Sequence, residues 1–208
     1  VWLLRPRTPT LVTPVRPVPL TSYQGSEEYP TLSLDGNQVA FSWNGERQDN
    51  TDIYVKPVGT GTPLRLTDDP AADVSPAWSP DGRWIAFVRT PRGKLQIILI
   101  PPLGGPERVL VEMDALIEFE GPWLAWTRDG KWLAGPFKEA SDEPPAVCLF
   151  SIESGEKRRL TSPPANVLAD ASLAISPDGR SLAFNRLRSG GANDLFVLRL
   201  TSSLTAEG

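Results

Sequence analysis

Residues 76–87, PAWSPDGRWIAF, decide the fold of this chain. The stretch combines a large apolar residue, Ser or Thr, one variable residue and the pair Asp-Gly, followed by a short apolar run. Proline presets φ, Asp accepts backbone hydrogen bonds and Gly supplies a positive φ, so the stretch predicts a tight turn between two β-strands. Four copies of the pattern occur: Leu32–Gly36, Trp78–Gly82, Trp126–Gly130 and Ile175–Gly179.

The four copies recur at a nearly constant spacing, because their aspartates are 46, 48 and 49 residues apart. A period in the forties, with turn signals and short β-rich runs, is typical of β-propeller blades. We therefore predict an all-β propeller built from four-stranded blades at about residues 22–67, 74–111, 121–161 and 171–208. In the third blade, Gly135-Pro136 is expected to interrupt the second strand.

The two ends of the chain raise the question of ring closure. The fourth repeat ends at Gly208, where its outer strand is expected to begin. Residues 15–21 have the spacing of an outer strand, and in a ring that closes on itself they would pair with blade four and complete it. An open sheet edge favours aggregation, which is why propellers close. Two interpretations stay open: a closed four-bladed ring, or a part of a larger ring, which the non-Met start and the abrupt end favour.

Residues 1–14 are expected to form a proline-rich linker. The apolar residues 1–4 precede Arg5 and Arg7, and they are either the tail of a membrane segment or an ordinary terminus. Prolines separated by Thr and Val favour an extended, semi-rigid spacer after this point. Any link to a membrane would therefore lie upstream of the propeller.

Composition argues against several function classes. The 208 residues carry a net charge of −4 without a basic cluster, which argues against a nucleic-acid partner for this segment. Histidine is absent, so the chain alone supplies neither a Ser-His-Asp nor a Cys-His apparatus. The single cysteine, Cys148, forms no internal disulfide and cannot replace the missing histidine ligands of a transition metal. We therefore expect no enzymatic activity, no cofactor and no metal.

The quoted stretch resembles the PD40 repeat of the TolB-like propeller family, as do Asp52–Val55, Pro63–Thr67, Arg158–Thr161 and Pro177–Phe184. The resemblance covers residues 15–208 and implies the blade without implying an activity. Family members include the periplasmic TolB protein, propeller domains of prolyl-oligopeptidase-like peptidases and sensor domains of membrane-anchored bacterial regulators. Many have six blades, so the resemblance implies a larger ring. Repeat three departs from the family at Arg128, where proline is usual.

The resemblance leaves three functions to weigh. The first, which we expect, is a non-catalytic sensor or interaction propeller of a larger bacterial protein, located in the periplasm or otherwise outside the cytoplasmic membrane. It would bind a protein, a peptide or a small cationic ligand. The second is the substrate-gating propeller of a prolyl-oligopeptidase-like serine peptidase whose catalytic domain lies outside this chain. The third is a periplasmic TolB-like interaction protein.

The most specific site prediction is an acidic channel mouth. When the repeats are aligned on Asp-Gly, one position just before each inner strand is acidic in three of four repeats. In a propeller this position lies where the chain crosses to the next blade, so a negative ring there would attract a basic peptide or a cation. Ordinary polar loops are the alternative. The residues at this position are Glu27, Asp73, Gly121 and Asp170, with Glu28 and Glu120 as neighbours.

The Asp-Gly pairs themselves are interpreted as structural turns. Four copies that lie one blade apart cannot converge on one reacting atom, so they predict neither a metal site nor a catalytic site. The residues are Asp35, Gly36, Asp81, Gly82, Asp129, Gly130, Asp178 and Gly179. The recurring tryptophans, Trp43, Trp78, Trp84, Trp126 and Trp132, are expected to pack between blades.

Overall fold

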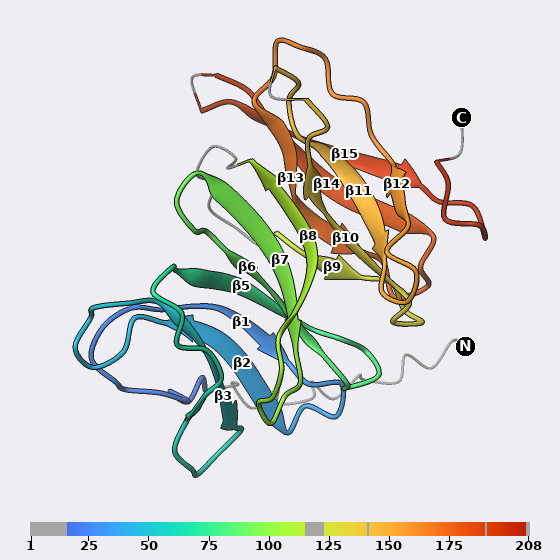
Figure 1. The fold of residues 1–208 in the computed structure, drawn as a ribbon. Coiled ribbons are helices and arrows are strands. Elements are labelled where there is room, and N and C mark those ends of the chain that lie inside the picture. Colours follow the sequence, from blue (N-terminus) through green and yellow to red (C-terminus); the bar gives the residue numbers. More distant parts are fainter. Residues whose placement is uncertain (1–15, 115–122, 141, 190, 207–208) are drawn as a thin grey trace, which may run out of the picture.

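The structure, a computed structural model, describes residues 16–114, 123–140, 142–189 and 191–206. In this part the chain forms β-strands and turns without any helix, and hence without a helix long and apolar enough to cross a membrane. The strands form antiparallel sheets that succeed one another along the chain as propeller blades (Figure 1). The predicted all-β propeller is therefore confirmed.

The first two blades are four-stranded meanders, in which each strand pairs with the next one along the chain. Blade 1 consists of β1 (Glu27–Leu32), β2 (Gln38–Trp43), β3 (Asp52–Pro57) and β4 (Leu64–Arg65). Blade 2 consists of β5 (Asp73–Trp78), β6 (Ile85–Arg89), β7 (Lys94–Ile100) and β8 (Arg108–Asp114). Figure 1 shows blade 1 in blue to teal and blade 2 in green.

The third blade repeats the meander, and the fourth has only three strands in the described residues. Blade 3 consists of β9 (Ala125–Trp126), β10 (Trp132–Phe137), β11 (Ala146–Ser151) and β12 (Lys157–Arg159). Blade 4 consists of β13 (Ala169–Ile175), β14 (Ser181–Leu187) and β15 (Asn193–Arg199). A turn after β15 brings Ala206 against Leu200 in an isolated antiparallel bridge, where a fourth strand would start.

The turn between the first and second strand has the same construction in all four blades. A Ser or Thr hydroxyl donates to the Asp carboxylate over 2.6–2.7 Å, and the backbone N–H two residues after Asp donates to the same oxygen. The following Gly adopts a φ of 68–72°, which residues with a Cβ adopt only at an energetic cost. The Asp-Gly pairs thus fix four identical turns.

The inner strands β1, β5 and β13 share a bulge in their middle. Their pairing with the second strand shifts register between Glu28 and Thr31 in β1, and at the equivalent positions of β5 and β13. The residues at the bulge, Tyr29, Ser75 and Ser172, have left-handed φ values of 52–54°. Such strained positions persist only where the surrounding structure holds them. The bulge divides each inner strand into a starting half and a half that leads into the Asp-Gly turn.

Apolar clusters between successive blades form the core. Ile53 and Phe87 belong to the cluster between blades 1 and 2, and further clusters join blade 2 to blade 3 and blade 3 to blade 4. Trp78 lies in the first of these clusters. Trp126 packs against the second and donates its indole N–H to the Ala77 carbonyl over 2.9 Å. Trp78 and Trp126 therefore pack between blades, as we predicted, and Trp84 and Trp132 pack against the second and third of these clusters. Trp43 does not, because it lies in a separate cluster within blade 1.

Gly135 marks a close approach between blades 2 and 3. A Cβ at this position would lie 3.1 Å from Cδ1 of Ile97 and 3.2 Å from Cδ2 of Leu124. β10 nevertheless continues through Gly135 and Pro136, which pair with Cys148 and Val147 of β11. The expected interruption of this strand is wrong, because the glycine accommodates the neighbouring blade and leaves the pairing with β11 intact.

The N-terminal segment does not complete blade 4. Residues 16–21 form no strand, while Leu20 and Tyr23 pack against the apolar cluster of blade 1. The Tyr23 ring lies 5.0 Å from the Trp43 ring. The pairing of residues 15–21 with blade 4, expected if the ring closes on itself, is therefore wrong for residues 16–21, because Leu20 packs on blade 1 and Val18 is 83% exposed. Val15 and the predicted linker 1–14 lie outside the described residues.

The blades form an open array in the described residues. The buried clusters there join blade 1 to 2, 2 to 3 and 3 to 4, and none joins blade 4 to blade 1. On β15, Leu195 and Val197 are 74% and 65% exposed. Figure 1 shows blade 4, in red, at the opposite end of the array from blade 1.

Candidate functional site

The inner strands present two different ends. Glu27 and Asp73 are the first residues of β1 and β5, and Asp170 is the second residue of β13. We call this the strand-start end. The four Asp-Gly turns follow the opposite end of the inner strands, which we call the turn end. The two ends carry different side-chain chemistry.

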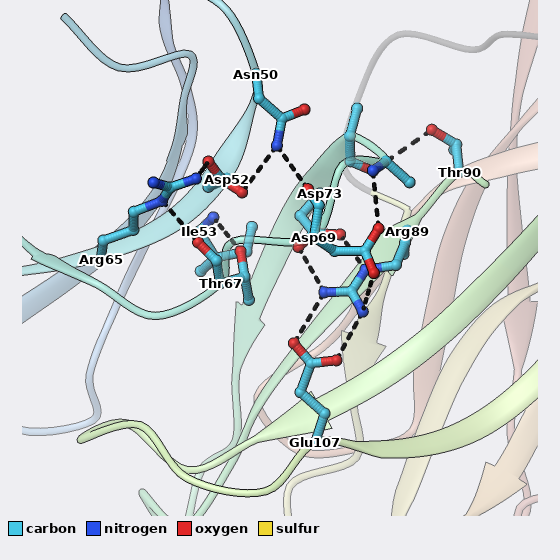
Figure 2. A network of polar contacts seen from close by, with 12 residues as sticks. Asn50, Asp52, Ile53, Arg65, Thr67, Asp69, Asp73, Arg89, Thr90 and Glu107 are labelled. Atoms are coloured by element: carbon cyan, nitrogen blue, oxygen red, sulfur yellow. Dashed lines mark hydrogen bonds and ion pairs between the residues drawn. The ribbon is translucent and has the colours of Figure 1, made fainter.

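At the strand-start end of blade 2, Asp73 is buried in an ion pair (Figure 2). The two strands place Asp73 directly opposite Arg89, the last residue of β6. Arg89 Nε and Nη2 donate to the two carboxylate oxygens of Asp73 over 2.7 and 2.8 Å. The Asp73 side chain is 0% exposed and that of Arg89 only 8%. This bidentate geometry is the strongest that an arginine makes with a carboxylate.

Arg89 holds two further carboxylates. Its Nη1 and Nη2 donate to the Glu107 carboxylate over 2.7 and 2.8 Å, and Asp69 lies 3.5 Å from Nη1. Burial raises the pKa of the Asp73 carboxyl, and the hydrogen bonds from Arg89 and Thr67 offset only part of this effect. Burial opposes the charge of Arg89, but the hydrogen bonds to Asp73 and Glu107 raise its pKa above the usual value. Arg89 therefore stays charged and is the counter-ion that the three carboxylates share.

Blade 4 repeats this arrangement. Asp170 lies opposite Arg186 of β14, which donates to both carboxylate oxygens over 2.7 and 2.9 Å. Asp170 is 0% exposed, and the Arg186 side chain is 17% exposed. The hydrogen bond to Asp170 raises the pKa of Arg186. The Arg186 guanidinium also lies 4.6 Å from the centre of the Phe196 ring.

Blade 1 differs because the position of Arg89 holds Trp43, which lies opposite Glu27. Glu27 accepts a 2.6 Å hydrogen bond from the Thr21 hydroxyl, and its other carboxylate oxygen is buried without a partner. The neighbouring Glu28 is exposed and accepts from the Ser26 hydroxyl over 2.7 Å. Glu120 lies outside the described residues.

The expectation of an exposed negative ring at the strand-start end is therefore wrong for Asp73 and Asp170. Both carboxylates lie below the surface, and each is neutralised by an arginine one strand away. A cation would have to displace a buried guanidinium to reach them. Asp73 and Asp170 therefore do not offer a binding site for a small cationic ligand.

At the turn end, the inner strands of all four blades line one hollow of about 360 Å³, which we call the inner hollow. Its lining includes Leu32 and Leu34 from blade 1, Trp78 from blade 2, Trp126 and Arg128 from blade 3 and Ile175 from blade 4. Leu32 and Leu34 are 59% and 79% exposed. Contiguous exposed apolar side chains of this kind mark interaction sites.

A larger cavity of about 740 Å³ adjoins it between blades 3 and 4. Three exposed arginines, Arg128, Arg180 and Arg199, line this cavity, which we call the arginine cleft. The turn carboxylates Asp129 and Asp178 also line it. Arg128 belongs to the lining of both the cleft and the inner hollow. The sequence analysis did not predict this cleft, although Arg128, at a position where proline is usual, was the residue that could have indicated it.

The groups that could support covalent or metal chemistry are few. Within the described ranges, no three His, Cys, Asp or Glu residues lie close enough to hold a metal ion. Burial raises the pKa of the Cys148 thiol to about 11, so the reactive thiolate is scarce near neutral pH. The hollows at the turn end are lined by apolar side chains and exposed arginines, together with Asp129 and Asp178, and these groups favour binding.

Comparison with known proteins identifies relatives of two kinds. The PD40 family model, described as the TolB beta propeller domain, matches residues 10–114. The "Uncharacterized peptidase YuxL" of Bacillus subtilis (strain 168) is 32% identical over 169 residues, 81% of this chain and 23% of that protein. The "Protein TolB homolog" of Chlorobium chlorochromatii (strain CaD3) is 34% identical over 152 residues, 73% of this chain and 32% of that protein.

Among solved structures, TolB from Acinetobacter baumannii has the same fold, with a TM-score of 0.71 at 20% identity. The alignment covers 86% of this chain and 42% of that chain. The present chain thus spans less than half of this structure and about a quarter to a third of the two curated relatives.

Proposed function

The chain belongs to the TolB beta propeller domain family, and on this premise we propose that it is a non-catalytic module that binds a protein or peptide. It would act within a longer bacterial protein, whose further blades would complete the ring. The resemblance to TolB supports a location outside the cytoplasmic membrane. The peptide replaces the small cation as the expected ligand, because Asp73 and Asp170 are paired with arginine.

The inner hollow carries this proposal. Its lining comes from all four blades, so a ligand there would contact side chains that only the folded array brings together. Most of its lining residues are apolar, and the polar ones are Thr31, Ser79, Thr127 and Arg128. Concave apolar surfaces with a few polar groups are the usual form of ligand sites. A peptide with apolar side chains has the complementary chemistry.

The test is binding without turnover. A library of N-acetylated hexapeptides with randomised apolar positions is passed over the immobilised chain, and retained peptides are identified by mass spectrometry. We expect retained peptides of unchanged mass, and we expect Leu34→Glu to abolish their retention because it places a charge in the inner hollow. Cleaved peptides, or retention that Leu34→Glu leaves unchanged, would contradict the proposal.

A second candidate is the substrate gate of a serine peptidase. The similarity to YuxL, whose printed name calls it a peptidase, supports this alternative. The gate would also bind peptide without cleaving it, so the two candidates differ in the rest of the polypeptide. A Gly-x-Ser-x-Gly motif followed by a histidine in the longer protein, together with peptidase activity of that protein, would favour the gate.

A further inference from the structure

Most arginines of the described chain have a partner. Ion pairs hold the side chains of Arg47, Arg65, Arg83, Arg89, Arg158, Arg159, Arg186 and Arg188. Arg108 donates to the Ile152 carbonyl over 2.8 Å and lies over the Trp84 ring. In the described residues this leaves Arg16, Arg92, Arg128, Arg180 and Arg199 without an ion pair, a hydrogen bond from the guanidinium or an aromatic ring beside it. Three of these five line the arginine cleft.

The charge of the arginine cleft is nearly balanced. Asp129 and Asp178 oppose the three guanidinium groups, and one oxygen of each carboxylate already accepts the hydrogen bonds of its turn. Asp178 is ionised at neutral pH, and the hydrogen bond from Ser176 lowers its pKa further below the ordinary value. The lining therefore has an excess of one positive charge, which matches a ligand group with one negative charge.

The single excess positive charge of the arginine cleft favours a carboxylate over anions that carry more negative charge. A phosphate dianion would bring more negative charge against Asp129 and Asp178 than the single excess positive charge offsets. A nucleic acid would also face a chain with a net charge of −4. One carboxylate adds one negative charge, and its two oxygens match the planar fork of an arginine.

Arg128 lies at the border between the charged arginine cleft and the apolar inner hollow. Blades 2 and 4 have Pro80 and Pro177 at the same turn position, and a proline side chain has no hydrogen-bond donor. In blade 3 the arginine brings five N–H donors to the border of the arginine cleft and the inner hollow. A third hollow, lined by Leu34, Trp126, Arg128 and Ile175, shares residues with both.

We infer that the arginine cleft binds a carboxylate of a peptide whose adjacent apolar side chains occupy the inner hollow. This inference rests on the proposed function and adds the chemical class of the ligand. Arg128 donates to the carboxylate, while Arg180 and Arg199 supply further positive charge around it. The carboxylate is either the α-carboxylate at a peptide C-terminus or the side chain of an Asp or Glu within a peptide.

The experiment compares four forms of the same apolar hexapeptide library. The N-terminus is acetylated in each, and the C-terminus is a free acid, an amide, an amide preceded by Asp, or an amide preceded by phosphoserine. Retention on the immobilised chain is measured by mass spectrometry at low salt. We expect the free acid to be retained about tenfold more than the simple amide, as a charge-assisted hydrogen bond allows.

The variants Arg128→Glu and Arg92→Glu form a matched pair. Both change an exposed arginine without an ion pair by the same charge, but Arg92 does not line the arginine cleft. We expect Arg128→Glu to remove the preference for the free acid and Arg92→Glu to preserve it. Thermal unfolding of both variants should match the wild type, which separates lost binding from lost folding.

Each outcome decides the inference. Stronger retention of the Asp amide than of the free acid supports it and identifies a side-chain carboxylate as the source. Retention of the simple amide equal to that of both the free acid and the Asp amide, a preference for a carboxylate that survives Arg128→Glu, or stronger retention of the phosphoserine form overturns it. If retention still depends on Leu34 in those cases, the proposed function stands without the inference. If no library is retained, both are overturned.

Discussion

The two ends of the inner strands carry the same kinds of charged residue in opposite arrangements. At the strand-start end, Asp73 and Asp170 are 0% exposed, and an arginine on the next strand neutralises each one. At the turn end, Arg128 and Arg180 are exposed and form no ion pair within the described part of the chain. The difference shows that charged residues at equivalent positions of the repeats form a charged surface only where the neighbouring strand carries no counter-ion.

The largest expected effect comes from breaking the pair in blade 2. Arg89→Met leaves the buried Asp73 and the partly exposed Glu107 without their counter-ion, which should lower the free energy of unfolding by about 3–5 kcal/mol. Arg180→Met at the turn end should change it by less than about 0.5 kcal/mol. Urea denaturation followed by tryptophan fluorescence measures both values. Equal costs for the two variants would break the comparison.

A smaller effect is expected in blade 4. The Arg186 side chain is 17% exposed and pairs with a single carboxylate, whereas Arg89 pairs with three. Arg186→Met should therefore cost about 1–3 kcal/mol, the usual range for a buried acceptor that loses its donor. The same denaturation assay measures it. If Arg186→Met lowers the free energy of unfolding as much as Arg89→Met does, then the additional contacts of Arg89 with Glu107 and Asp69 do not contribute to stability.

The turn end should respond to acid. The hydrogen bond from the Ser176 hydroxyl lowers the pKa of Asp178 below its usual 3.8. The stabilisation linked to this shift is therefore present above pH 3.8 and lost as the pH falls through the lowered value. The difference in stability between wild type and Ser176→Ala should be constant from neutral pH to about pH 4 and should shrink below it. A difference that grows in acid would contradict the assigned cause.

The smallest expected effect concerns Cys148, which should not react with a thiol reagent in the native chain. Cys148 is 1% exposed, and burial raises the pKa of its thiol to about 11. A thiol reagent at pH 8 should leave the native chain unmodified and should react quickly in urea. Arg89→Met should increase the rate of modification, because a less stable chain opens more often, whereas Arg180→Met should not. Rapid reaction of the wild type would contradict the burial of Cys148.

The sequence predicted the turns and blades that repeat along the chain. It did not predict features that depend on contacts between strands or between blades. The Asp-Gly turns need only local hydrogen bonds and a positive φ, so one motif was sufficient to predict the blades. The charge of Asp73 was visible in the sequence, but its neutralisation depends on Arg89, sixteen residues later and directly opposite in the sheet. The position of Leu20 on blade 1 depends on packing that its spacing does not encode. Arg128 was visible as a departure from proline, yet its cavity needs residues from two blades.

The binding surface that we propose is the turn end of the inner strands. Hydrogen exchange of backbone amides, measured with and without the best-retained peptide, locates the ligand on the folded chain. We expect slower exchange at residues 126–128, 175–180 and 199–204, with no change at residues 71–75 and 168–171. Protection confined to residues 71–75 and 168–171 would place the ligand at the strand-start end and would rule out the turn end as the binding surface.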